Sequence, residues 1–189
     1  HCGEAVKRGE KLAYRLAPGG GLVLKFTKEG QKGDSKSSLE VVNRFITKEK
    51  GQEIAKRYPG AVLIPLIKPT KAQGEHNVIP LAMCVKISKE TGMGLNPYFL
   101  QQTSNWSGAT KRRGKGNVER QFMSVDYAAK GVAPEGTKIV LVDDHMTSGQ
   151  SFSQARLVAE ENGAEVVGCV SLTHSQFGTI LGISEKTKT

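Results

Sequence analysis

The sequence is poor in the residues that cross-link small domains or anchor proteins in membranes. Only three cysteines, Cys2, Cys84 and Cys169, occur among 189 residues, too few and too scattered for a disulfide framework or a zinc cluster. No apolar run approaches the roughly 20 residues of a membrane span, and no signal peptide is visible. We therefore expect a cytoplasmic protein without membrane contact. An apolar content of 38% is enough for the core of one α/β domain.

Acidic residues are also scarce. The chain has 18 aspartates and glutamates against 27 lysines and arginines, which gives a formal net charge of +9. Such an excess favours polyanionic partners, which include nucleic acid and also pyrophosphorylated sugars. Charge alone does not separate these two classes of ligand.

What the chain does contain is an alternation of apolar runs and helical patterns. It predicts an α/β fold with a mainly parallel, twisted sheet, right-handed crossovers and flanking helices. We expect strands at residues 22–26, 61–65, 97–101, 122–125, 139–142 and 165–173. We divide the chain into an N-terminal strand and hood segment (1–37), an α/β core (38–175) and a tail (176–189).

Capping residues mark the ends of the expected helices. Ser38 is suited to cap a first helix, which Pro59 and Gly60 stop. A second helix is expected after Asn77, with a proline in its first turn. A third ends at Gly163, as a left-handed terminus would.

The most informative stretch is residues 139–151, an apolar run followed by two acids and a Thr-Ser-Gly-Gln-Ser turn. Open α/β sheets bind their ligands at the carboxyl ends of the strands, where Asp143 and Asp144 would lie. The turn offers hydroxyls and backbone N–H groups at the start of a helix, which suits a phosphate. Carboxylates can accept hydrogen bonds from a diol or help to hold Mg²⁺. A phosphate beside a diol indicates phosphorylated ribose, although an Asp-Asp turn before a capped helix is the simpler alternative.

This stretch resembles the phosphoribosyl pyrophosphate (PRPP) motif of the type I phosphoribosyltransferases. The acidic pair matches, and Thr147, Ser148, Gly149 and Ser151 match the phosphate loop, whereas His145 stands where an aliphatic residue is usual. The resemblance implies that Asp143 and Asp144 bind the ribose hydroxyls and Mg²⁺. It also implies that the 5-phosphate is held by Thr147, Ser148, Gly149, Gln150 and Ser151.

A second loop follows the strand at 61–65. In type I phosphoribosyltransferases the corresponding loop receives the pyrophosphate, which implies this role for Lys68, Lys71, Gln73 and Gly74. The order Ile64-Pro65-Leu66, Gln73-Gly74, Asn77 and Leu81-Ala82 is similar to the ComF-like branch, although Gln73 stands where an arginine is common. An ordinary surface loop with two lysines is the alternative.

A third segment, residues 110–122, is basic and rich in glycine. It looks like the flexible loop of the same branch, and Arg112, Arg113 and Lys115 would close over the departing pyrophosphate and neutralise its charge. A nucleic-acid-binding strip, with Trp106 stacking on a base, is an equal alternative. His174 or Phe177, after the last strand, are further candidates for contacts to the base or the pyrophosphate.

Two main hypotheses remain. The first is a Mg²⁺-dependent phosphoribosyltransferase that transfers 5-phosphoribosyl from PRPP to a base or similar nucleophile. The second is a non-catalytic ComF-like protein that binds PRPP, a ribose 5-phosphate nucleotide or DNA and is linked to DNA uptake. A hydrolase that uses the Asp-Asp pair for metal chemistry is a weaker third. The resemblance also implies a possible homodimer.

Overall fold

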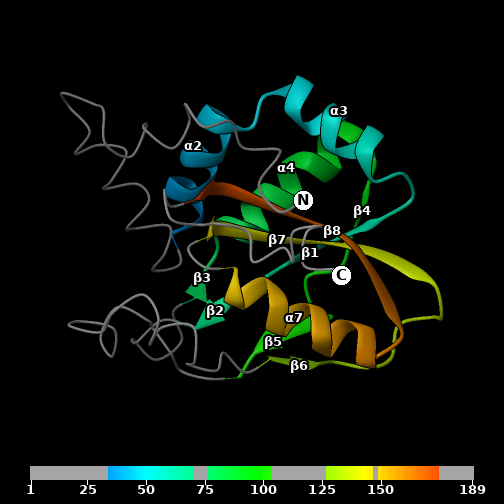
Figure 1. Cartoon of the computed structure of the whole chain (residues 1–189). Coiled ribbons are helices and arrows are strands. Elements are labelled where there is room, and N and C mark those ends of the chain that lie inside the picture. Colours follow the sequence, from blue (N-terminus) through cyan, green and yellow to red (C-terminus); the bar gives the residue numbers. More distant parts are fainter. Residues whose placement is uncertain (1–33, 70–75, 104–126, 147–148, 175–189) are drawn as a thin grey trace, which may run out of the picture.

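The centre of the molecule is a parallel sheet, seen edge-on in Figure 1. The computed structural model describes residues 34–69, 76–103, 127–146 and 149–174. Adjacent strands of the sheet all pair in parallel, which confirms the predicted α/β class. The order of the strands is β4 (Gly94–Leu95), β1 (Val62–Pro65), β7 (Thr137–Met146) and β8 (Ala164–His174).

Helices cover both faces of the sheet. Figure 1 shows helices above the sheet and α7 (Gln150–Glu161) below it. Alternate residues of β7 serve the two layers: Val140 and Val142 pack with the upper helices, and Ile139 and Leu141 pack with α7. A strand buried on both faces explains why this run is uniformly apolar. The upper helices are α2 (Ser35–Phe45), α3 (Lys48–Arg57) and α4 (Ile79–Thr91).

The first predicted helix is two helices. Helix α2 begins three residues before Ser38, because Asp34 is its N-cap and accepts a hydrogen bond from the backbone N–H of Ser37 at 2.9 Å. The chain breaks at Ile46, and Thr47 caps α3 through the N–H of Lys50. The sequence analysis did not predict this break, because residues 47–53 carry no large apolar side chain from which a second helical pattern could be recognised.

The start of α4 also differs in detail. Val78 is the N-cap residue, and Asn77 acts one position earlier by accepting a hydrogen bond from the N–H of Ile79 at 3.2 Å. Pro80 lies in the first turn, as predicted. Gly163 follows the end of α7 with φ +88°, which confirms the left-handed terminus.

The strand predicted at 97–101 is displaced and belongs to a separate ladder. It is β5 (Leu100–Gln102), which pairs antiparallel with β6 (Tyr127–Ala129) and packs beside α7. The strand that joins the main sheet after α4 is β4, too short to show a sequence pattern. A third ladder joins β2 (Lys68–Pro69) to β3 (His76–Asn77). The strands predicted at 22–26 and 122–125 lie outside the described residues.

Strand β8 contains a β-bulge that was not predicted from the sequence. Ile139 pairs with Val166 but Val140 pairs with Gly168, so β8 has one extra residue at this point. A Cβ atom on Gly168 would lie 2.4 Å from the ring of Tyr58, so a larger residue cannot be accommodated without movement. The bulge and the ring together fix the register of β8 beyond this point.

Two remaining predictions concern the whole chain. Cys84 and Cys169 are buried, as expected. Within the described ranges, no helix has the length and apolarity to cross a membrane. The division into hood segment, core and tail stays a prediction.

Candidate active site

The acidic pair lies at the carboxyl end of β7, where it was predicted. Asp143 is 1% exposed and Asp144 is 3% exposed, values that are unusual for carboxylates. Strand β1 ends beside them, because Pro65 pairs with Val142, and the N–H of Leu66 donates to the carbonyl oxygen of Val142 at 2.8 Å. The chain that leaves β1 therefore passes directly over the two acids.

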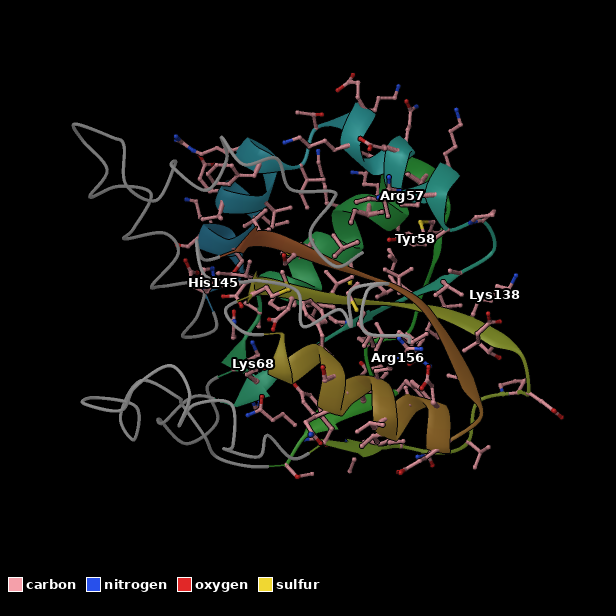
Figure 2. All side chains as sticks on the ribbon, viewed as in Figure 1. Arg57, Tyr58, Lys68, Lys138, His145 and Arg156 are labelled. Carbon is pink, nitrogen blue, oxygen red and sulfur yellow. The ribbon has the colours of Figure 1, made fainter. Side chains whose placement is uncertain are left out.

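Lys68, on this segment, is the partner of both acids. Its Nζ lies 2.5 Å from Oδ2 of Asp143 and 3.9 Å from Oδ1 of Asp144. The backbone N–H of Asp144 donates to Oδ1 of Asp143 at 2.9 Å, so both oxygens of Asp143 accept hydrogen bonds. Figure 2 shows Lys68 and His145 at the same end of the sheet, far from Lys138 at the start of β7. The structure thus brings together residues that the sequence assigned to two different loops.

Burial dominates the electrostatics of this cluster. It raises the pKa of Asp143 to about 7, a shift that Lys68 opposes and Asp144 reinforces. Burial by itself would lower the pKa of Lys68, but the two carboxylates outweigh it and hold that pKa above its ordinary value. Lys68 therefore stays an ammonium at any physiological pH.

Helix α7 begins six residues after Asp144 along the chain. Its N-cap residue is Gly149, with φ +79°, and no side-chain hydrogen bond caps the helix. Ser151 lies in the first turn and is half-buried. An N-terminus of this kind presents backbone N–H groups and the positive end of the helix dipole, which is the arrangement that binds phosphate.

Two buried hydroxyls near the acids were missed by the sequence analysis. Tyr127 is 8% exposed, and its Oη has no hydrogen-bond partner among the described residues. Burial and the nearby Asp143 raise the pKa of this phenol, whereas Lys68 and Ser151 lower it, so all three lie close by. Ser171, on β8, pairs in register with Asp143, and its buried Oγ likewise has no partner in the described part of the chain. No periodicity marks a lone Tyr or Ser as part of a site.

The other predicted site residues stay predictions, and the structure gives the place in the fold of three of them. His145 is exposed on β7, and His174 is the last residue of β8, paired with Met146. Gln150 begins α7. Outside the described residues lie Thr147, Ser148, Lys71, Gln73, Gly74, Trp106, Arg112, Arg113, Lys115 and Phe177.

The donor set limits how a metal can be held. Among the described residues there is no group of three or more His, Cys, Asp and Glu side chains suited to a metal ion. The two carboxylates of the pair already contact Lys68. A resident ion with protein ligands alone does not fit this arrangement. Mg²⁺ that is carried by substrate phosphates and keeps water ligands is compatible with it.

Comparisons with known proteins come from structure. No protein-family model matches the sequence, and no curated protein does. One similar solved structure is an adenine phosphoribosyltransferase, 14% identical over 77% of this chain and 74% of that chain, with a TM-score of 0.46. A second is the adenine phosphoribosyltransferase of Saccharomyces cerevisiae, solved with adenine, 14% identical over 77% and 72%, with a TM-score of 0.44.

A third similar structure is the orotate phosphoribosyltransferase of Aeropyrum pernix. It is 19% identical over 77% of this chain and 64% of that chain, with a TM-score of 0.40. These structural neighbours are phosphoribosyltransferases, the group that the acidic pair and its loop resemble, while the ComF-like branch stays a prediction. The reaction is therefore inferred from the site alone.

Proposed function

We propose that this protein binds PRPP and transfers its 5-phosphoribosyl group to a base or similar nucleophile, with release of pyrophosphate. One observation carries the proposal. Two buried acids at the carboxyl end of β7 are followed along the chain by a helix N-terminus that no side chain caps. A phosphate site and a diol site lie one short turn apart, as ribose 5-phosphate requires. The exposed acid pairs common on protein surfaces have neither this burial nor this neighbour.

Each described group has a role in this proposal. Asp143 and Asp144 accept hydrogen bonds from the ribose hydroxyls, and the first turn of α7 holds the 5-phosphate. Lys68 lies on the segment assigned to the pyrophosphate and supplies positive charge beside the breaking bond. Loss of pyrophosphate leaves a cationic sugar centre, so positioning and charge stabilisation are the main contributions expected of the protein.

Magnesium belongs to the same proposal. It would enter with the pyrophosphate of PRPP, and its chemistry is to neutralise the charge that develops on the leaving group. Arg112, Arg113 and Lys115 are proposed to assist at the same place. They are chosen for their charge and their family resemblance.

Calorimetry with PRPP and Mg²⁺ tests the proposal. We expect binding by the wild type and a loss of about tenfold or more in affinity for Asp143→Asn and Asp144→Asn, since each change removes an acceptor of hydroxyl hydrogen bonds. Lys86→Met, which alters an ion pair on α4, is the matched control and should bind as the wild type does. No heat with the wild type would remove the proposal. A screen of bases for pyrophosphate release then identifies the acceptor.

The net charge of +9 favours a second candidate, a non-catalytic protein that binds a nucleotide or DNA. This is the role that the ComF-like resemblance implies, with a link to DNA uptake. An electrophoretic shift of DNA that weakens steeply with salt supports it. Pyrophosphate release with any base, together with no DNA shift, contradicts it.

A further inference from the structure

We infer that Lys68 is the built-in cation of the Asp143–Asp144 pair, which excludes divalent metal ions from the pair and allows ribose 5-phosphate to bind there without metal. The exclusion of metal stands on the described contacts alone. The second half, ligand binding without metal, rests on the proposed function.

The position of Lys68 is built into the fold. Its backbone belongs to β2, where Lys68 pairs with Asn77 of β3, and Asn77 is itself 6% exposed. Two residues earlier, the N–H of Leu66 is bonded to the carbonyl of Val142 on the central strand. The main chain is therefore anchored to β7 two residues before the lysine and to β3 at the lysine itself. These backbone contacts position the ammonium beside the acids. A lysine on a flexible surface segment would have no such fixed position.

The ammonium occupies the place that a metal ion would need. Mg²⁺ and Ca²⁺ bind carboxylate oxygens at about 2.0–2.6 Å and strip away water to do so. Oδ2 of Asp143 is already 2.5 Å from Nζ of Lys68, and Oδ1 accepts the N–H of Asp144. A second cation at the pair would have to displace a like charge from buried surroundings, where repulsion is strong.

The same ammonium prepares the site for an anionic ligand. Two bare buried carboxylates would repel a sugar phosphate, whereas one lysine halves their charge. An ammonium has three hydrogen-bond donors, and the Lys68 side chain remains 25% exposed. It therefore has donors to offer to an oxygen of the ligand while it keeps its contact with Asp143.

A second lysine–carboxylate pair, on α4, provides a matched control. Lys86 and Glu90 of α4 form an ion pair of 2.6 Å, and the Lys86 side chain is 26% exposed. This pair has the same chemistry and a similar exposed lysine, but it lies away from the carboxyl ends of the strands. Lys86→Met therefore reports the effect of removing one lysine without altering the site.

The first experiment measures Mn²⁺ binding by electron paramagnetic resonance, with no sugar present. We expect the wild type to show no Mn²⁺ binding that Asp143→Asn abolishes. Lys68→Met should gain a site at least about tenfold tighter than any site of the wild type. That gain should vanish in Lys68→Met combined with Asp143→Asn. Lys68→Arg should exclude the metal as the wild type does, and Lys86→Met should match the wild type.

The second experiment titrates ribose 5-phosphate by calorimetry, in EDTA and again in Mg²⁺. The wild type should give the same affinity within about twofold in both conditions. Lys68→Met should lose about tenfold or more in EDTA and recover in Mg²⁺, because the metal then takes the place of the ammonium.

The outcomes separate the two proposals. Wild-type Mn²⁺ binding that depends on Asp143, or no gain in Lys68→Met, overturns the role of Lys68. If Lys68→Met does not fold, Lys68→Gln replaces it, and the comparison of wild type with Asp143→Asn still decides. Absence of ribose 5-phosphate binding in both conditions counts against the proposed function, and the Mn²⁺ result then decides the cation inference alone.

Discussion

Two lysine–carboxylate pairs in this molecule look alike and differ in what surrounds them. Lys68–Asp143 and Lys86–Glu90 measure 2.5 Å and 2.6 Å, and their lysines are 25% and 26% exposed. The first joins residues 75 positions apart and buries its acid to 1%, while the second joins neighbours on one helix turn and leaves its acid 18% exposed. The N–O distance and the exposure of the lysine therefore do not show how strongly a pair stabilises the fold. The burial of the acid decides whether breaking the pair is costly.

The largest expected effect is on folding. Lys68→Met leaves two buried acids without their cation, so we expect a loss of about 3–5 kcal/mol in the free energy of unfolding above about pH 8, where Asp143 of the wild type is ionised. Lys86→Met should cost about 1 kcal/mol or less, because this i,i+4 pair is only partly buried. Urea denaturation of both variants measures the difference. Equal losses would show that the contrast in burial has no energetic meaning.

The second effect concerns pH. Burial raises the pKa of Asp143 to about 7, so the folded protein binds a proton that the unfolded chain releases near pH 4. The contribution of this group to stability is therefore complete below about pH 4 and lost as the pH rises through 7. Relative to Asp143→Asn, the wild type should lose roughly 3–4 kcal/mol between about pH 4 and pH 8, because each pKa unit corresponds to about 1.4 kcal/mol. Urea denaturation across this pH range measures both proteins. If their free energies of unfolding change with pH in the same way, the shifted pKa of Asp143 is contradicted.

The third effect is on the ligand and compares the acids of the two pairs. Asp143→Asn should weaken ribose 5-phosphate by about tenfold, or about 1.4 kcal/mol, because it removes an acceptor for the diol. Glu90→Gln, the equivalent change in the other pair, should leave the affinity unchanged, since α4 supplies no group to the site. Calorimetry on the two variants reads this directly. A similar loss in both would mean that the effect is general and not local.

The smallest effect separates groups that serve the ligand from groups that serve the fold. Tyr127→Phe removes a buried hydroxyl that has no partner among the described residues, so stability should change by less than about 0.5 kcal/mol or rise slightly. If that hydroxyl contacts the ligand, affinity for ribose 5-phosphate should fall by about threefold to fivefold. Thermal melts and calorimetry on the same sample give both numbers. A clear loss of stability with unchanged affinity would make Tyr127 a purely structural residue.

The acidic pair could be located from sequence because its signal is local. A buried strand, two acids and the beginning of a helix follow one another within 13 residues, 139–151, so periodicity and residue type suffice. Lys68 was also identified, on the loop assigned to the pyrophosphate, but its pairing with Asp143 was not. That contact depends on β1 and β7 being neighbours in the sheet, which no local pattern encodes.

Other features were hidden for similar reasons. Strand β4 has two residues, fewer than a pattern needs, and its neighbour β5 was placed in the wrong sheet. Tyr127 and Ser171 acquire their positions only through pairing with Gln102 and Asp143. Residues such as these become visible only when the strands are assembled.

The extra residue in β8 determines which side chain stands next to the acid. If β8 paired without the bulge, Val170 would lie opposite Asp143, and a branched hydrocarbon would face the carboxylate. With it, Ser171 takes that place and Val170 turns to the opposite layer, where it packs with Leu172. Deleting Val167 would therefore place the side chain of Val170, and not the hydroxyl of Ser171, opposite Asp143. The acidic pair itself would be unchanged. The polarity of the surroundings of Asp143 therefore depends on one extra residue in the neighbouring strand β8.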